Sequence, residues 1–258
     1  MTGTVCLMYH ELQIPGRKLC HDFSGHTRYA VRQCEFRGQL LFLKDSKWNG
    51  ISVSESLSDS KATSQAVTIT FDDGSETDLT AAVPLLKEAG FNATFYIIVG
   101  WLGKPGYLST AQLRELATSG FEIGCHSMNH RYLTGLNDRE LNIEITEAKA
   151  RLEQILGIQV DHLSCPGGFW NRRIAYAAKQ SGYRSLATSR TGVNTGQTDP
   201  YCLTRLTMMR GIALPSFDRI CRGRGLFVRR AKEAILSVPK TLLGSDSYVR
   251  VHSALHRA

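Results

Sequence analysis

The 258-residue chain has no uninterrupted apolar run that approaches the ~20 residues a membrane-spanning helix needs. Residues 1–5 also lack a basic stretch followed by an apolar one, so no secretory signal is visible. Cysteines are scattered: there are seven, an odd number, and no Cys-x-x-Cys pair. This pattern indicates reduced thiols rather than a disulfide framework. We therefore expect a cytoplasmic protein.

What is present is the composition of a globular protein, with 42% hydrophobic and 21% charged residues. The length suits one large α/β domain. The net charge of +8 is unevenly distributed, because residues 1–209 carry 21 Lys and Arg against 20 Asp and Glu, whereas residues 210–258 carry 10 against 3. The near-neutral first part argues against a nucleic-acid partner.

Strand-like and helix-like runs alternate along the chain, which is typical of a parallel α/β fold. Strands are predicted at residues 4–9, 66–71, 92–99, 121–125, 161–165, 183–187 and 203–209. Helix starts are predicted where Ser109 pairs with Gln112, where Asn137 pairs with Glu140, and at Asn171.

Two stretches are predicted to be loops, because residues 11–30 lack clear periodicity and residues 54–65 are rich in Ser. Candidate functional residues follow the predicted strands: His10, Asp72, Asp73, His126, Pro166, Arg190 and Arg210. In a barrel such strand ends share one face, so a barrel is favoured over an open sheet.

Two short motifs carry the clearest chemical signal. Thr-Phe-Asp-Asp-Gly occupies residues 70–74, and His-Ser-Met-Asn-His occupies residues 126–130. One carboxylate and two imidazoles are the ligands expected of a hydrolytic metal centre, and the second carboxylate could act as a general base. Asp-Asp-Gly is also common in turns, and histidines four apart occur by chance. Both motifs together, each after a strand, favour the metal site.

The chain resembles the polysaccharide deacetylase family, also called carbohydrate esterase family 4. It is most similar to the branch that opens with a Met-Tyr-His strand, here residues 8–10. The two motifs above and Pro166-Gly167-Gly168, with Asn171, extend the resemblance from about Val5 to Arg210. The resemblance implies an α/β fold, a distorted (β/α) barrel over residues 1–210. We expect residues 211–258 to form a basic helical extension packed on or beside it.

The resemblance also implies roles for individual residues. Asp72 becomes the general base, and the ligands of a divalent metal become Asp73, His126 and His130. Zn²⁺ is the expected ion, with Co²⁺, Ni²⁺ or Mn²⁺ as alternatives. The backbone N–H of Gly167 takes the oxyanion position, with Gly168 beside it. Trp170 could stack on a sugar, or it could simply pack beside a helix start.

In two places the chain departs from the family pattern. Ser164 occupies the position of an Arg that steadies the base in the fullest pattern, which leaves the pKa and orientation of Asp72 unexplained. Arg210 ends the last predicted strand, where many members have a catalytic His. His10 is the best replacement as general acid, although it could equally be a structural histidine. Arg190 and Arg210 could bind a substrate phosphate or carboxylate, or pair with Asp.

The activity implied is removal of an N-acyl group, with N-acetyl the first expectation, from an amino sugar of a glycan or a lipid-linked glycan precursor. Alternatives are a deformylase, a cyclic amide or imide hydrolase, and a catalytically inactive sugar-binding module. Retention of both Asp72 and Asp73 argues against inactivity, because a structural metal site does not need the base.

The C-terminal segment suggests where the substrate lies. Apolar residues from Phe227 to Val238 follow helical spacing, and basic residues lie largely off that stripe. Such a helix could cap the barrel, or it could contact anionic lipid at the inner face of the membrane. The second alternative fits a lipid-linked precursor. The sequence does not indicate an oligomeric state.

Overall fold

The computed structural model describes residues 3–20, 27–58 and 65–226. Its centre is a curved sheet in the order β10-β1-β5-β6-β7-β8-β9, in which every pairing except β10 with β1 is parallel. The main strands are β1 (Gly3–Tyr9), β5 (Ala66–Asp73), β6 (Thr94–Ile97), β7 (Glu122–Cys125), β8 (His162–Ser164) and β9 (Ser185–Ala187). Shorter strands are β2 (Leu12–Gln13), β3 (Val31–Arg32), β4 (Asn49–Ile51), β10 (Asn194–Thr195) and β11 (Leu206–Thr207).

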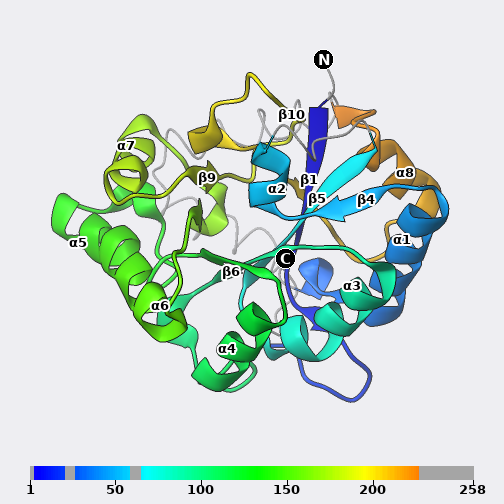
Figure 1. Ribbon diagram of the computed structural model, residues 1–258, viewed down its shortest axis with the longest axis horizontal. Helices are drawn as coiled ribbons and strands as arrows, with labels where there is room; N and C mark the ends of the chain where they lie inside the picture. Colours follow the sequence, from blue (N-terminus) through cyan, green and yellow to red (C-terminus); the bar gives the residue numbers. More distant parts are fainter. Residues whose placement is uncertain (1–2, 21–26, 59–64, 227–258) are drawn as a thin grey trace, which may run out of the picture.

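The segment from Leu203 to Thr207 joins the two ends of this sheet. Leu203 forms a parallel bridge with Ala187 of β9, and β11 then pairs in parallel with β1. Helices surround the sheet on its outside (Figure 1). The predicted α/β class and distorted (β/α) barrel are therefore confirmed.

The helices begin where the sequence signals indicated. Ser109 accepts a hydrogen bond from the Gln112 N–H, and Asn137 accepts one from the Glu140 N–H, so both predicted capping boxes are confirmed. The α-helices are α1 (Gln33–Asp45), α2 (Val53–Leu57), α3 (Val83–Ala89), α4 (Thr110–Thr118), α5 (Asp138–Asn142), α6 (Ala148–Leu156), α7 (Arg172–Gln180) and α8 (Leu214–Cys221). Single π-turns, η2 (Asp78–Ala82) and η5 (Ile143–Glu147), precede α3 and α6.

Both loop predictions need correction. Residues 53–57 form α2, because Ser52 caps the helix with its hydroxyl and Glu55 completes the capping box. The cap, Ser52, lies just before the serine-rich stretch, and the helix it starts runs into that stretch. Within residues 11–30, β2 forms a short parallel pair with β3.

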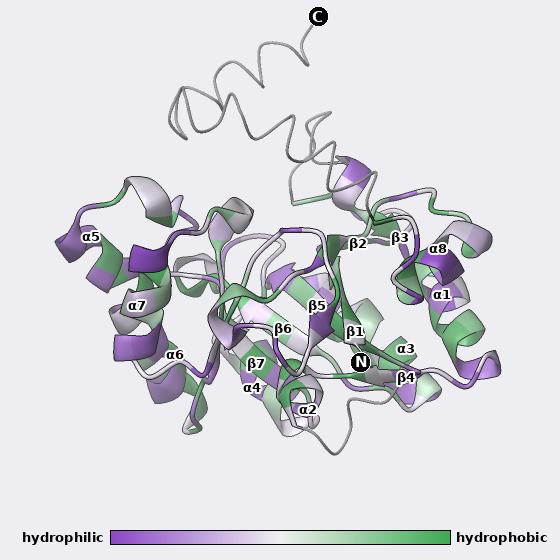
Figure 2. Cartoon of the chain, turned by 90° about the horizontal axis from the view of Figure 1, so that it is seen from above, coloured by the Kyte–Doolittle hydropathy of each residue, from purple (hydrophilic) through white to green (hydrophobic). Residues whose placement is uncertain are grey.

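The core lies between the sheet and its helices. In β5 every residue from Ala66 to Asp72 is buried, and the Phe71 ring stacks on Tyr9 and Phe95 at centroid distances of 5.3 and 5.0 Å. Apolar residues follow the central strands, while outer helices such as α7 carry polar residues (Figure 2). All seven cysteines are free. Within the described residues, no helix is both long and apolar enough to cross a membrane.

Residues 211–226 pack against the barrel. Phe217 of α8 belongs to the main core and lies edge-on to Phe42 of α1, with ring centroids 6.0 Å apart. The predicted domain boundary at residue 210 stays a prediction. The apolar stripe from Phe227 to Val238 lies outside the described residues.

Candidate active site

The two sequence motifs meet at one edge of the sheet. Asp72 and Asp73 end β5, His126 directly follows β7, and β6 lies between these strands. Because the strands are parallel, their carboxyl ends lie on one face. Three non-glycine residues here have positive φ: Asp73 (84°), Ser127 (67°) and His130 (59°). Such strain is uncommon and gathers at functional sites.

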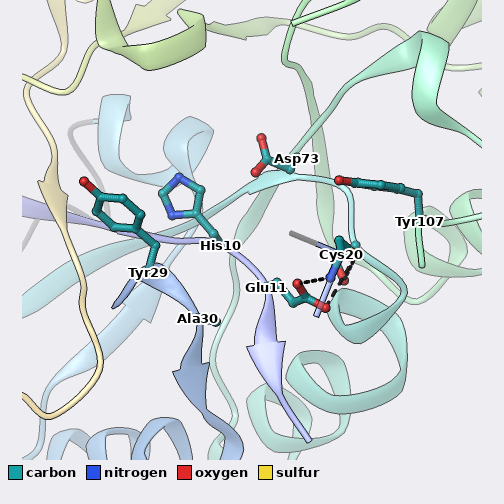
Figure 3. A pocket seen from close by; sticks show the side chains of 8 residues that line it. His10, Glu11, Cys20, Tyr29, Ala30, Asp73 and Tyr107 are labelled. Atoms are coloured by element: carbon teal, nitrogen blue, oxygen red, sulfur yellow. Dashed lines mark hydrogen bonds between the residues drawn. The ribbon is translucent and has the colours of Figure 1, made fainter. Parts of the chain in front are cut away.

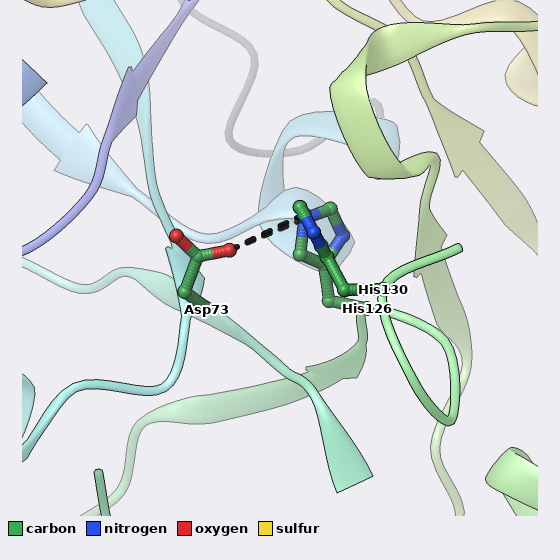
Figure 4. Close-up of side chains that lie close together, drawn as sticks. All are labelled: Asp73, His126 and His130. Atoms are coloured by element: carbon green, nitrogen blue, oxygen red, sulfur yellow. Dashed lines mark ion pairs between the residues drawn. The ribbon is translucent and has the colours of Figure 1, made fainter. Parts of the chain in front are cut away.

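The three predicted metal ligands come together. Ligand atoms of Asp73, His126 and His130 all lie within 4.8 Å of one another (Figure 4). Asp73 Oδ1 is 3.6 Å from the Nε2 atom of each histidine, and this buried oxygen has no hydrogen-bond partner among the described residues. An unpaired buried carboxylate oxygen is unfavourable, and a cation between the three groups would satisfy it. The donor set therefore fits a divalent ion.

The local hydrogen bonds prepare His126 to act as a ligand. Its Nδ1 lies 3.0 Å from the Ser164 carbonyl oxygen, and a carbonyl can only accept, so Nδ1 carries the proton. The Nε2 lone pair is then free to face Asp73. Burial lowers the pKa of His126 to about 3 and also lowers the pKa of His130. Both rings are therefore neutral near pH 7, the form that binds metal.

The two neighbouring aspartates differ in acidity. Burial raises the pKa of Asp73 to about 6, with Asp72 adding to the effect and His10 opposing it. Burial acts in the same direction on Asp72. However, the positive charge of Arg205, helped by His126, outweighs burial and holds the pKa of Asp72 well below its usual range. Asp72 is therefore ionised at neutral pH, as a general base must be.

Arg205 is the site residue that the sequence reasoning missed. Its fully buried guanidinium donates to both carboxylate oxygens of Asp72, at 2.7 and 2.8 Å. Nη2 also donates to Ser164 Oγ at 2.7 Å, and that hydroxyl donates to Asp72 Oδ2 at 3.2 Å. Arg205, which lies 41 residues after Ser164, thus provides the guanidinium group that the family pattern places at position 164. The one available signal was a charged residue inside a predicted strand.

A pocket lies beside Asp73. His10 and Tyr29 line one side and Tyr107 the other, with Glu11 and Cys20 below (Figure 3). The His10 ring is 5.6 Å from the Tyr29 ring, and its buried Nδ1 has no hydrogen-bond partner among the described residues. The structure therefore brings His10 to the site, and its role as general acid stays a prediction.

Gly167 and Gly168 form a tight turn after β8. Their φ angles are 63° and 72°, and a Cβ would lie 2.6 Å from the Tyr132 ring at Gly167 and 2.3 Å from Ser189 at Gly168. Only glycine suits these positions. The Gly168 N–H already donates to the Cys165 carbonyl at 2.8 Å, so Gly167 stays the candidate oxyanion donor.

The remaining candidates are placed differently. The Trp170 indole N–H donates to the Tyr201 carbonyl at 2.7 Å and the ring packs on the core, which favours the packing alternative. Arg190 is exposed and lies 3.5 Å from Cys202 Sγ. Arg210 Nε donates to the carbonyl of Ala30, which lines the pocket. Arg210 thus bonds directly to a residue of the pocket wall.

Comparison with known proteins agrees with this geometry. The family model described as polysaccharide deacetylase matches residues 59–186, a span that holds Asp72 and the three ligands. The chain belongs to the polysaccharide deacetylase family. Membership in the Met-Tyr-His branch stays a prediction, because the matched span begins after residues 8–10.

Individual relatives cover different shares of the chain. YxkH of Bacillus subtilis strain 168, whose name assigns it to the same family, is 27% identical over 201 residues, or 76% of this chain and 72% of YxkH. The peptidoglycan-N-acetylglucosamine deacetylase of Bacillus cereus is 33% identical over 124 residues, which are 48% of this chain and 56% of that protein. The match therefore spans little more than half of the Bacillus cereus enzyme.

Solved structures share the fold. The Streptococcus pyogenes deacetylase PplD in complex with acetate superposes with a TM-score of 0.76 at 22% identity, covering 85% of this chain and 98% of PplD. At this identity the likeness concerns the barrel itself, and the residues of the site must carry the functional argument.

Proposed function

We propose that the protein is a metal-dependent hydrolase that removes an N-acyl group, in the first place N-acetyl, from an amino sugar of a glycan. The observation that carries the proposal is the ligand set Asp73, His126 and His130 beside the ionised Asp72–Arg205 pair. Family membership supports the reaction. The Bacillus cereus relative, named for N-acetylglucosamine of peptidoglycan, supports the substrate class.

A divalent ion held by Asp73, His126 and His130 would polarise the acyl carbonyl and make water more acidic. Asp72 accepts the proton of the attacking water. Its Oδ2 lies 3.7 Å from His126 Nε2, so the carboxylate is beside the ligand set. A carboxylate of such low pKa is a weak base by itself, and it suffices because the water is acidified. Arg205 keeps Asp72 ionised and fixes its orientation.

Two further groups complete the proposed chemistry. The Gly167 N–H donates to the oxygen of the acyl group as negative charge develops there. His10 gives a proton to the departing amine from the other side of the pocket. This role is proposed because His10 and Asp73 line the same pocket (Figure 3).

The test is release of acetate from an N-acetylated amino-sugar oligomer by Zn²⁺-loaded protein, with the N-formyl oligomer and cyclic imides assayed in parallel. Asp72→Asn should keep its metal and lose on the order of 10²–10⁴-fold in kcat. His130→Ala should lose metal as well. Near-normal turnover by Asp72→Asn would overturn the mechanism. Sugar binding without hydrolysis of any substrate would favour the inactive binding module.

A further inference from the structure

Two arginines bond to residues 29 and 30, which line the pocket together with His10. The Arg28 guanidinium lies 4.7 Å from the centre of the Tyr29 ring and donates to the Tyr29 hydroxyl at 2.7 Å. Arg210 approaches from the strand that closes the barrel: its backbone N–H donates to the Arg28 carbonyl at 2.9 Å, and its Nε donates to the Ala30 carbonyl at 3.1 Å. Arg28 and Arg210 thus both contact the pocket-wall segment Tyr29–Ala30.

The positive charge of these groups is not neutralised within the described residues. No described carboxylate lies within 4.0 Å of the guanidinium nitrogens of Arg28 or Arg210. Two carboxylates on the described adjoining segments are already engaged, Glu11 by Arg17 and Glu35 by Arg32. Arg210 Nη2 is buried and has no acceptor among the described residues. A buried donor without an acceptor is unfavourable, so this nitrogen is suited to a ligand oxygen.

We propose that Arg210 and Arg28 recognise an anionic group, a carboxylate or a phosphate, carried by the amino-sugar substrate. The inference rests on the proposed function, because it names a substituent of the same substrate. Guanidinium groups bind both anions through paired, charge-assisted hydrogen bonds. A sugar whose acyl group lies at Asp73 would pass His10 and Tyr29, which line the same pocket (Figure 3). Arg28 and Arg210 bond to the wall residues Tyr29 and Ala30, so a substituent at this end of the sugar would meet them.

Three matched oligomers test the proposal: neutral N-acetylglucosamine, the same oligomer with one ether-linked carboxylate, and the same oligomer with one phosphomonoester. The Zn²⁺-loaded full chain should show a higher kcat/KM for at least one anionic oligomer than for the neutral one. Arg210→Gln and Arg28→Gln should each reduce that preference by about 10- to 100-fold, the range of a lost hydrogen bond to a charged group. The two anionic oligomers show which anion is used.

Controls separate recognition from folding. Arg28→Gln should lower kcat/KM for the anionic oligomer much more than kcat/KM for the neutral oligomer, because only the anionic one carries the group that Arg28 binds. Arg210→Lys keeps the positive charge but loses the paired hydrogen bonds. Its preference for the anionic oligomer should therefore lie between that of the native protein and that of Arg210→Gln. Arg151→Gln on α6, where Arg151 donates to Gln154 at 2.8 Å, should not change the preference. If the Arg28 and Arg210 variants lost kcat/KM equally on all three oligomers, the arginines would have a structural role and the proposal would be overturned.

Binding measurements distinguish failure of the inference from failure of the proposed function. Zn²⁺-loaded Asp72→Asn should bind the anionic oligomer more tightly than the neutral one by calorimetry. If native protein releases no acetate yet this preference remains, the hydrolase proposal fails and anion recognition stands. If native protein treats the neutral and anionic oligomers alike, the inference fails and the hydrolase proposal stands.

Discussion

At the scale of single residues, the site depends on a buried ion pair. Asp72 and Arg205 are both almost fully buried, and their two charge-assisted hydrogen bonds replace the water that each has lost. Such a pair is not strong evidence of net stability, because desolvating two charges is expensive. Its effect is to hold one carboxylate ionised and in a fixed orientation.

Replacing Arg205 by Met should therefore have two consequences. It leaves an ionised Asp72 buried without its partner, and breaking a buried ion pair in this way destabilises by roughly 3–5 kcal/mol. It also raises the pKa of Asp72, since burial is then opposed by less positive charge. We expect the acid limb of the kcat/KM profile to move to higher pH, and urea unfolding to show the loss of stability.

The sign of the pH dependence provides a check. In the native protein the pKa of Asp72 lies below its unfolded value of ~3.9, so its stabilisation is present above that value and is lost as pH falls. The deficit of Arg205→Met should be largest at neutral pH and shrink on acidification. Arg184→Met, which removes the exposed partner of Asp161, should cost less than about 1 kcal/mol. An equal deficit at acid and neutral pH would contradict this account.

At the scale of elements, the start of α7 fixes the glycine turn of the site. Gly167 and Gly168 are followed by Asn171, whose side chain accepts a hydrogen bond from the Ile174 N–H at 3.0 Å. The cap therefore sets where the helix begins and where the turn before it ends.

Asn171→Ala should lower stability by about 1 kcal/mol, the usual effect of losing an N-cap, and should also lower kcat because the Gly167 N–H is held less firmly. Asn137→Ala is the matched control, since Asn137 caps α5 through a bond of 2.9 Å from the Glu140 N–H. It should cost similar stability and leave kcat unchanged. Thermal unfolding and acetate release measure both effects, and equal kcat losses would contradict a specific role for the α7 cap.

At the scale of the whole molecule, we expect metal binding and folding to be coupled through Asp73. Burial raises the pKa of Asp73 to about 6, above its unfolded value, so metal-free stability decreases as pH rises through about 6. A cation pairs with the ionised carboxylate and removes this penalty. Zn²⁺ should therefore raise Tm more at pH 7.5 than at pH 5. Measured by calorimetry, the Tm of His130→Ala should rise little with Zn²⁺ at either pH. If Zn²⁺ raised the Tm of the native protein equally at pH 5 and pH 7.5, the coupling would be contradicted.

The basic C-terminal segment yields a prediction about location. We propose that it brings the enzyme to a lipid-linked precursor at an anionic membrane, because residues 210–258 hold 10 Lys and Arg against 3 Asp and Glu. Each basic residue near the surface contributes ~1 kcal/mol. The full chain should sediment with anionic vesicles at low salt, release as salt rises, and bind neutral vesicles poorly. Unchanged sedimentation of a folded protein truncated after Leu226 would assign the segment to packing.

Much of the fold could be predicted because its signals are local. Capping residues such as Ser109 and Asn137 lie within four residues of the groups they bond, so they are visible in the sequence. Short elements were harder to predict. The helix that Ser52 caps overlaps a stretch for which the sequence predicts a loop, because serines are common both in caps and in turns.

The sequence by itself determined the candidate catalytic group, because Asp72, Asp73, His126 and His130 lie in two compact motifs at the ends of strands. Tertiary structure decided what surrounds them. Arg205 reaches Asp72 across 133 residues, and Arg210 reaches Ala30 across 180, because the last strand closes the barrel beside the first. The spacing of residues along the chain does not reveal such distant pairs. They form only when the curved sheet brings the two ends of the domain together.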